Sequence, residues 1–233
     1  MADVYMAIGA HVGDAELTAG LVLANQALKG DKIITVALTG GERGNPPNLT
    51  VKEYRKQKEA EAKTFAEMLG GKAIVLDYVD GELPNNQEIR LEVAALIRKY
   101  RPKMIFTHWE KSMHKDHITT SKIVTDAQFF AGIDMGDKVE GKRHYAPIYF
   151  SENWEDADDF KPYIYITCSK EAYDLWKKAM AKHWFIMNSK SFRYFDYYTH
   201  LAVVRGALAR SDYAQAFAVY EYQKKVVRNE LWE

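Results

Sequence analysis

Short apolar segments alternate with longer amphipathic segments through the first 130 residues of the chain. The apolar segments have the length of buried strands, and the segments between them repeat hydrophobic residues at helical spacing. Because neighbouring parallel strands need a helical crossover, this alternation predicts an α/β fold with a mostly parallel sheet. We expect strands at residues 4–9, 33–38, 73–76 and 104–107, and helices at residues 14–28, 50–69, 86–100 and 116–130.

The second half of the chain has a less regular pattern. No internal repeat, low-complexity tract or clear linker separates it from the first half. We therefore expect one domain spanning residues 1–233, with a C-terminal elaboration that begins at about residue 140. Strands are expected at residues 146–150 and 163–167, and helices at residues 169–183, 201–209 and 213–226.

The charge balance argues against nucleic acid as a partner. Lys plus Arg and Asp plus Glu both total 32, so the formal net charge is zero, and no basic stripe is evident. No apolar run approaches the roughly 20 residues of a membrane span, and the N-terminus lacks the features of a signal peptide. The single cysteine, Cys168, cannot form an intrachain disulfide, which fits a reducing compartment. We expect a cytoplasmic protein without a membrane span.

Polar clusters follow the predicted strands, at residues 11–14, 39–44, 77–82 and 108–117. In a parallel sheet the carboxyl ends of the strands meet at one edge, where ligands bind. His11, Asp14 and His117 would supply two nitrogens and one oxygen to Zn²⁺ and leave a fourth position for water. Helix capping by Asp14 together with surface histidines explains the same spacing equally well.

Several motifs resemble those of one enzyme family and occur in the family's order. The segment AHVGDAEL at residues 10–17 resembles the AHPDD(E/A)EL signature of the LmbE-like, or PIG-L, N-deacetylases. TGGERG at residues 39–44 is similar to the family's Thr-x-Gly-Glu-x-Gly turn, and HKDH at residues 114–117 is similar to its His-Pro-Asp-His. Further landmarks are Asp80-Gly81, Arg101-Pro102, Arg205-Gly206 and YAQAF at residues 213–217.

The resemblance implies a Rossmann-like sheet with helices on both faces and a zinc-dependent active site. His11, Asp14 and His117 stand where the family has its zinc ligands. His114 would stabilise the oxyanion or protonate the leaving amine, and Asp116 would orient His114. The family's substrates are mostly N-acetylated sugars, so a small N-acetylated sugar conjugate is the implied partner.

The resemblance and the loop positions also suggest residues that bind substrate. Lys58 aligns with a substrate-facing Arg of the family, and Arg55 lies one helical turn earlier; a solvated helix face is the alternative for both. Asp80 could bind a sugar hydroxyl or simply begin a turn. Glu42 and Arg43 could hold substrate hydroxyls or pair with each other at the surface.

The chain departs from the family pattern at Gly13, where the family has the aspartate that acts as general base. Glycine cannot accept a proton, and the loss of a positioned base typically costs about 10²–10⁴-fold in rate. Either another carboxylate replaces the base, or zinc-activated water needs only His114 as base and acid, or hydrolysis is lost. The candidate carboxylates are Glu16, Glu42, Glu110 and Asp116.

Together these patterns predict a zinc-dependent hydrolase that removes an N-acetyl or similar N-acyl group from a small sugar-like substrate. The alternative is a catalytically weakened zinc protein that binds sugars or regulates on the same scaffold. Aromatic residues concentrate at residues 184–198, where they would form core packing, a sugar-stacking wall or a subunit contact. Self-association into a homo-oligomer is a further expectation.

Overall fold

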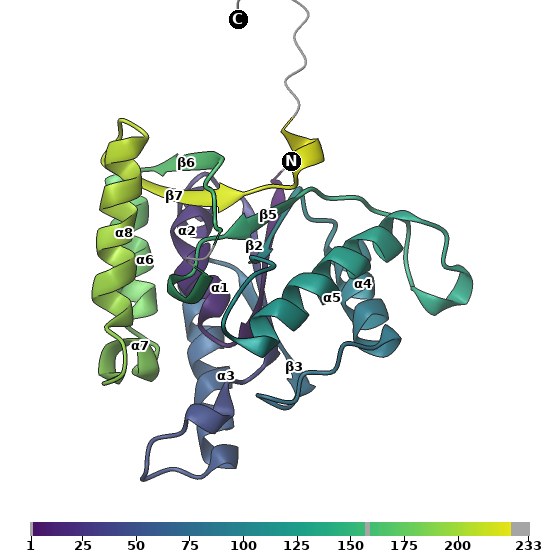
Figure 1. Ribbon diagram of the computed structural model, residues 1–233, viewed down its shortest axis with the longest axis horizontal. Coiled ribbons are helices and arrows are strands. Elements are labelled where there is room, and N and C mark those ends of the chain that lie inside the picture. Colours follow the sequence, from purple (N-terminus) through teal and green to yellow (C-terminus); the bar gives the residue numbers. More distant parts are fainter. Residues whose placement is uncertain (1, 157–158, 225–233) are drawn as a thin grey trace, which may run out of the picture.

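The computed structural model describes residues 2–156 and 159–224 of the chain. Its strands are β1 (Val4–His11), β2 (Lys32–Thr39), β3 (Lys72–Tyr78), β4 (Met104–His108), β5 (Ile148–Ser151), β6 (Ile164–Cys168) and β7 (Tyr213–Ala218). Within the described residues these form one seven-stranded sheet in the order β3-β2-β1-β4-β5-β7-β6 (Figure 1). β1 to β5 pair in parallel, whereas β7 runs antiparallel to both β5 and β6.

Helices cover both faces of this sheet (Figure 1). α4 (Gln87–Tyr100) and α5 (Lys115–Gly132) pack on one face. The other face carries α1 (Asp14–Thr18), α2 (Gly20–Leu28), α3 (Val51–Met68), α6 (Lys170–Met180) and α8 (Tyr194–Leu208), and the short α7 (Trp184–Asn188) lies between α6 and α8 in the chain. Short 3₁₀ helices are η1 (Glu42–Gly44), η2 (Gly136–Lys138), η3 (Trp154–Asp156) and η4 (Glu221–Gln223).

β1 illustrates why the sequence of this sheet is so apolar. Ala7 packs into the core beneath α2 and α6, while Met6 and Ile8 pack into the core beneath α4 and α5. Successive side chains of a strand point to opposite faces, so a strand covered on both faces must be apolar at nearly every position. The predicted Rossmann-like, mostly parallel sheet with helices on both faces is confirmed.

Helix ends follow the capping residues in the sequence. Thr50 accepts the N–H of Glu53 and begins α3, and Asn86 accepts the N–H of Ile89 and begins α4. These side chains satisfy backbone donors that the first helical turn leaves free. The helix expected at residues 14–28 is divided into α1 and α2, because Ala19 has non-helical dihedral angles (φ −128°, ψ −7°).

The helix expected at residues 213–226 was wrong. Residues 213–218 form β7, an interior strand whose Phe217 pairs with Ser151 of β5 on one side and Ile164 of β6 on the other. Strands on both sides offer backbone partners, and this tertiary pairing overrides the helical preference of an alanine-rich segment. Residues 225–226 lie outside the described residues.

The order of the strands reverses beside β1, which pairs with β2 on one side and with β4 on the other. The chain leaves β1 toward α1 on one face and leaves β4 toward α5 on the opposite face. Such a reversal opens a crevice at the carboxyl ends of the two strands. The predicted ligand residues follow these two strands.

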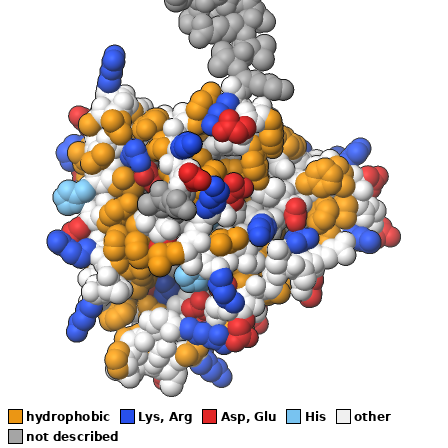
Figure 2. All heavy atoms as spheres, viewed as in Figure 1, with side chains coloured by type: hydrophobic (Ala, Val, Ile, Leu, Met, Phe, Trp, Pro, Cys, Tyr) orange, Lys and Arg blue, Asp and Glu red, His pale blue; other side chains and the backbone are white. Residues whose placement is uncertain are grey.

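The surface shows no preference for one sign of charge on the face drawn in Figure 2, where acidic and basic side chains are intermingled. This distribution agrees with the zero net charge. Within residues 2–156 and 159–224, no helix combines the length and the hydropathy needed to cross a bilayer.

Candidate active site

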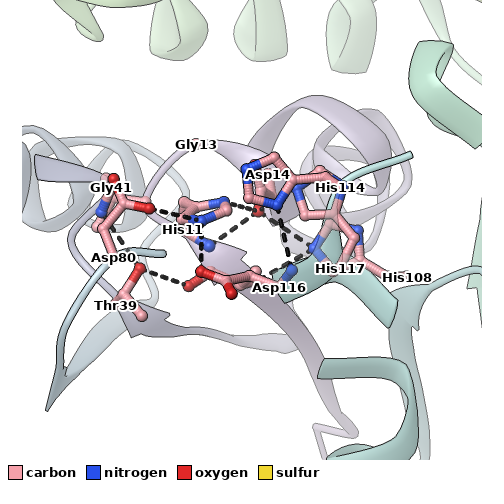
Figure 3. Close-up of polar contacts among 12 residues, drawn as sticks. His11, Gly13, Asp14, Thr39, Gly41, Asp80, His108, His114, Asp116 and His117 are labelled. Atoms are coloured by element: carbon pink, nitrogen blue, oxygen red, sulfur yellow. Dashed lines mark hydrogen bonds and ion pairs between the residues drawn. The ribbon is translucent and has the colours of Figure 1, made fainter. Parts of the chain in front are cut away.

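Segments from distant parts of the chain meet at the carboxyl ends of β1 and β4 (Figure 3). His11 is the last residue of β1, and Asp14 is the first residue of α1. His108 ends β4. His114 caps the N-terminus of α5, and His117 lies within the first turn of that helix.

Asp14 lies between the two histidines that were predicted to share a metal ion with it. Its Oδ2 atom is 3.1 Å from Nδ1 of His11 and 3.4 Å from Nε2 of His117. The backbone N–H of His11 also donates to Oδ2 of Asp14, at 2.8 Å, across the tight turn that joins β1 to α1. The structure therefore brings these three residues into one cluster.

The second ring nitrogen of each histidine faces carboxylates. Nε2 of His11 is 3.1 Å from Asp80 and 3.5 Å from Asp116, and Nδ1 of His117 is 3.2 Å from Glu155. Metal-binding histidines commonly have such a carboxylate behind the ring, which fixes the ring and its tautomer. Both rings thus turn their other nitrogen toward the shared aspartate.

These carboxylates favour the protonated form of both imidazoles. Burial is the largest single influence and lowers the pKa of each ring, but the charge of Asp14 and the hydrogen bonds to carboxylates together outweigh it. The pKa of His117 rises to about 9, and the pKa of His11 rises well above its usual range. Although burial opposes the effect, the charges of both histidines hold the pKa of Asp14 well below its usual range. A bound divalent cation would take the place of these protons.

The donor atoms of the cluster suit zinc, because imidazole nitrogens combined with a carboxylate oxygen form a common zinc ligand set. Nε2 of His11 is within ion-pair distance of two carboxylates but is aligned for a hydrogen bond with neither, and Oδ1 of Asp116 has no partner among the described residues. Unsatisfied buried polar atoms of this kind are expected where an ion or ligand belongs. The described residues offer three overlapping ligand groups: His11, His114 and His117; Asp14, His108 and His117; and His11, Asp80 and Asp116.

The two remaining histidines of the cluster have different surroundings. Nε2 of His108 lies 3.0 Å from the backbone nitrogen of Ala10 and 3.1 Å from Oδ2 of Asp14, and the ring stacks on His117 with centroids 4.0 Å apart. Nδ1 of His114 accepts the N–H of Asp116, so the neutral ring carries its proton on Nε2. Burial and the neighbouring histidine charges lower the pKa of His114, which keeps it neutral. It is therefore a hydrogen-bond donor.

The expected contact between the Asp116 carboxylate and His114 is absent from the described structure. The carboxylate instead accepts the N–H of Gly81 at 2.7 Å and faces His11. Only the backbone N–H of Asp116 reaches His114, because the first turn of a helix leaves its N–H groups free to bond the capping side chain. Asp116 thus orients His114 through its backbone N–H, while its carboxylate faces a proposed metal ligand.

The cluster opens into a cavity of about 780 Å³. His11, Asp14, His114 and His117 all contribute to its lining. Part of the aromatic-rich stretch noted in the sequence forms another wall. The aromatic lining residues are Tyr54, Trp154, Trp184, Phe185, Tyr194 and Tyr198.

Lys58 and Asp80 line this cavity, whereas the other residues suggested for substrate binding do not. Glu42 is buried and accepts the N–H of Asp80 at 3.0 Å, which orients the loop after β3. Arg43 is exposed and pairs with Glu82. Among the described residues, neither alternative for Glu42 and Arg43, a position for substrate contact or pairing with each other, is seen; each residue instead contacts the loop at residues 80–82.

Arg55 supports the fold instead of facing the cavity. Its guanidinium donates to the backbone oxygens of Leu76 and Tyr78, at 2.7 Å and 3.0 Å, and to Glu59 at 2.9 Å. A planar guanidinium can serve several acceptors at once. Arg55 thereby ties α3 to the end of β3, a long-range contact that local spacing could not reveal.

Gly13 is enclosed by the C-terminal half of the chain. Its φ of 109° lies in the region that favours glycine. A Cβ atom built at this position would lie 2.4 Å from both Cε1 and Cζ of Phe185. An aspartate here would therefore need a strained backbone and a displaced aromatic ring.

The carboxylates first considered as substitutes for the missing base, Glu16, Glu42, Glu110 and Asp116, do not line the cavity. Among the described residues, the lining carboxylates besides Asp14 are Asp80 and Glu155. No sequence motif points to Glu155, which lies in the short η3 after β5. Phe185 belongs to the aromatic stretch at residues 184–198, but no local pattern places it beside Gly13.

Comparison with known proteins relates this site to a family. The family model for GlcNAc-PI de-N-acetylase (PIG-L) matches residues 6–128. Diacetylchitobiose deacetylase of Thermococcus kodakarensis is 30% identical over 133 residues, 55% of this chain and 50% of that protein. 4-Oxalmesaconate hydratase of Pseudomonas putida is 24% identical over 218 residues, 89% of this chain and 81% of that protein.

A solved structure extends the likeness in fold to nearly the whole chain. The 4-carboxy-2-hydroxymuconate hydratase GalB of Pseudomonas putida KT2440 superposes with a TM-score of 0.85 at 22% identity, covering 98% of this chain and 99% of that one. The family match spans more than half of this chain and includes the turn after β1 and the start of α5. This chain belongs to the GlcNAc-PI de-N-acetylase (PIG-L) family.

Proposed function

We propose that this protein is a zinc-dependent hydrolase that removes an N-acetyl or similar N-acyl group from a small sugar-like substrate. The observation that carries the proposal is the position of Asp14 between His11 and His117, each backed by a carboxylate, at the edge of a large cavity. His11, Asp14 and His117 would hold the ion. Zinc bound at such a site acidifies water and polarises a carbonyl oxygen.

His114 would act on the substrate directly. Its Nδ1 is occupied by the N–H of Asp116, so its Nε2–H is the group free to donate. A neutral imidazole that donates from a fixed tautomer can stabilise developing negative charge on the acyl oxygen and can then give its proton to the leaving amine. Its lowered pKa keeps the ring in this form.

A group other than residue 13 would accept the proton of the attacking water. Asp80 and Glu155 line the cavity, and each contacts the far nitrogen of a proposed ligand histidine. His114 is not a candidate in this tautomer, because its Nδ1 accepts the N–H of Asp116 and its Nε2 carries the proton. The proposal therefore accommodates Gly13 without a loss of all basic groups near the reaction.

The cavity favours a substrate larger than an acyl group alone. Its volume of about 780 Å³ and its aromatic walls suit an amphipathic molecule such as a sugar conjugate. Aromatic rings offer flat apolar faces beside polar edges, which matches the two kinds of surface on a sugar ring.

A second candidate function is the addition of water to a carbon–carbon double bond. The relative that aligns with 89% of this chain is named a hydratase. The absence of a side chain at Gly13, where the deacetylase motif has its base, is compatible with a different reaction on the same scaffold. In this case the same cluster would polarise a carbonyl or carboxylate of an unsaturated acid.

The experiment that tests the proposal combines metal analysis with a substrate panel. Purified wild-type protein should contain stoichiometric zinc, and His117→Ala should contain almost none, with His200→Ala as an exposed control. The panel should include diacetylchitobiose, N-acetylglucosamine conjugates and 4-oxalmesaconate. Amine release that requires zinc supports the hydrolase, hydration of the acid supports the second function, and a zinc-free wild type refutes both.

A further inference from the structure

The peptide group between Val12 and Gly13 is held at both ends by buried side chains of opposite charge. Nζ of Lys58 donates to the oxygen of Val12 at 2.6 Å. The N–H of Gly13 donates to Oε2 of Glu16 at 3.0 Å. These backbone atoms belong to the same peptide unit, so one amide plane lies between a lysine of α3 and a glutamate of α1. This unit lies inside the turn that separates His11 from Asp14.

Both side chains are deeply buried, with 3% exposure for Lys58 and 2% for Glu16. Within the described residues, neither has an oppositely charged side chain within 4.0 Å. The amide therefore supplies the nearest partner of each, with its negative end at the lysine and its positive end at the glutamate. Each group keeps its hydrogen-bonding role in either protonation state, because a neutral amine still donates and a neutral carboxyl still accepts.

Packing from the C-terminal half encloses this arrangement. The ring of Phe185, from α7, has its centroid 3.7 Å from Nζ of Lys58 and covers Gly13. Nε1 of Trp176, from α6, donates to the backbone oxygen of Glu16 at 2.8 Å. Lys58 lines the cavity, but its ammonium is directed to a backbone oxygen and an aromatic face.

Because residue 13 is glycine, the backbone could adopt either of two orientations of this amide plane. With no side chain at position 13, the backbone can adopt positive and negative φ at similar cost, so rotation of the preceding peptide plane meets little local resistance. A half-turn of the plane would aim the Val12 oxygen at Glu16 and the Gly13 N–H at Lys58. The Val12 oxygen would then face another acceptor, the Glu16 carboxylate, and the Gly13 N–H would face another donor, the Lys58 amine. Leaving these polar groups without hydrogen bonds costs free energy in a buried site.

We propose that Lys58 and Glu16 are positioning residues that fix the Val12–Gly13 peptide and thereby hold His11 and Asp14 in register for one cation. This assigns Lys58 to the ligand turn and not to substrate recognition. The inference rests on the proposed function for the presence of a metal. The two hydrogen bonds that hold the peptide, from Lys58 and to Glu16, are called the clamp below, and they are present in the protein without metal. The proposal predicts that Lys58 and Glu16 both affect metal binding through the Val12–Gly13 peptide.

A double-mutant cycle tests this proposal. Lys58→Met and Glu16→Met each keep a side chain of similar length and remove the group that bonds the peptide, and the third variant combines them. The control cycle uses Lys63→Met and Glu67→Met, an exposed pair on the same helix α3 whose charged atoms lie 3.7 Å apart. Zinc dissociation constants are measured by chelator competition, and thermal unfolding is followed on metal-free protein.

Each single variant should weaken zinc binding by about 10–100-fold, the usual effect of losing a group that orients a ligand. The double variant should be weakened by far less than the product of the single effects, because both changes break the same clamp. The control variants should stay within about twofold of wild type. The KM for substrate, measured at saturating zinc, should change little in Lys58→Met.

Two outcomes would overturn the proposal. One is a Lys58→Met variant with wild-type zinc affinity and a raised KM, as expected of a substrate-binding lysine. The other is a double variant whose loss of zinc-binding free energy equals the sum of the two single losses. Should the wild type bind no zinc, the proposed function fails, while the unfolding midpoints still decide the clamp: a double variant that loses less than the sum of the single losses supports it, and additive losses reject it.

Discussion

The two sides of the cavity are built in opposite ways. One side, the ligand turn after β1 and the start of α5, consists of histidines and carboxylates joined by short polar contacts and anchored on strand ends. The other side, residues 153–155 and 184–198, supplies most of the aromatic rings of the lining, among them Trp154, Trp184 and Phe185. Trp154 also stacks on Phe192, with centroids 4.2 Å apart. The family model covers the first side and stops before the second.

This difference suggests that the two sides of the cavity have different roles. On the polar side, Asp14 and the histidines around it make directed polar contacts, and such contacts tolerate little change. The aromatic side is held by packing, which accepts rings of similar size. We therefore infer that the first side determines the reaction and that the second selects the substrate. Phe185 links the two, because it belongs to the aromatic side and covers Gly13 of the polar side.

The largest expected effect comes from removing the proposed acid on the polar side. His114→Ala should lower kcat by about 10²–10⁴-fold, because a positioned proton donor is lost. Zinc content should stay at the wild-type level, since His11, Asp14 and His117 are intact. Steady-state kinetics and metal analysis of the same preparation check both points. Loss of zinc in this variant would show that His114 belongs to the ligand set.

The contact between the two sides can be broken at Gly13. Gly13→Asp should lower the free energy of unfolding by about 2–6 kcal/mol, from backbone strain of about 1–3 kcal/mol and overpacking of about 1–3 kcal/mol. Gly30 also has positive φ, at 89°, but has open space around it, so Gly30→Asp should show the strain alone. Urea unfolding compares the two variants.

The Phe185→Ala background completes this comparison. Gly13→Asp should lose more free energy of unfolding than Gly30→Asp, and removing the Phe185 ring should abolish most of this difference, because the clash is with that ring. Equal losses for the two aspartate variants in the wild-type background would contradict the steric account. Activity in Gly13→Asp/Phe185→Ala then reports whether an acid at position 13 can serve as base.

The pH dependence of zinc binding distinguishes the polar side from a preformed neutral site. The pKa of His117 is raised to about 9, so this ring is protonated at pH 7 and zinc must displace the proton. The apparent affinity should rise about tenfold per pH unit for each displaced proton between pH 7 and 9, and level off for that proton above pH 9. Calorimetry in buffers of different ionisation enthalpy counts the protons; no release at pH 7 would refute the assignment.

The smallest expected effect lies on the aromatic side. Trp184→Ala should raise KM by about 2–10-fold, the equivalent of about 0.5–1.5 kcal/mol for one aromatic contact. Zinc affinity and kcat should stay near wild type. Tyr145→Ala, an exposed ring outside the cavity lining, is the matched control. A loss confined to kcat would place the ring in the reaction and break the proposed division.

The extent of prediction differed between the same two sides. Local pattern predicted β1 and the proximity of His11 to Asp14, because a strand and the turn after it involve neighbouring residues. Because the carboxyl ends of parallel strands lie at one edge of a sheet, the fold class then predicted His117 at the same edge. Glu155 and Phe185 had no local signal, since each reaches the site only through packing of the C-terminal half. The error at β7 has the same origin: its partners, β5 and β6, are distant in sequence.

The sequence by itself determined the parallel sheet and the sheet edge at which the polar clusters gather, and its motifs indicated the residues that we propose to hold a metal, because periodicity and motif spacing are encoded locally. The tertiary structure decided what the charged residues do. Arg55 turned to backbone oxygens, Asp116 to His11 and Lys58 to the Val12 peptide. A buried charge takes the best partners that folding brings within reach, and those partners come from other elements of the fold.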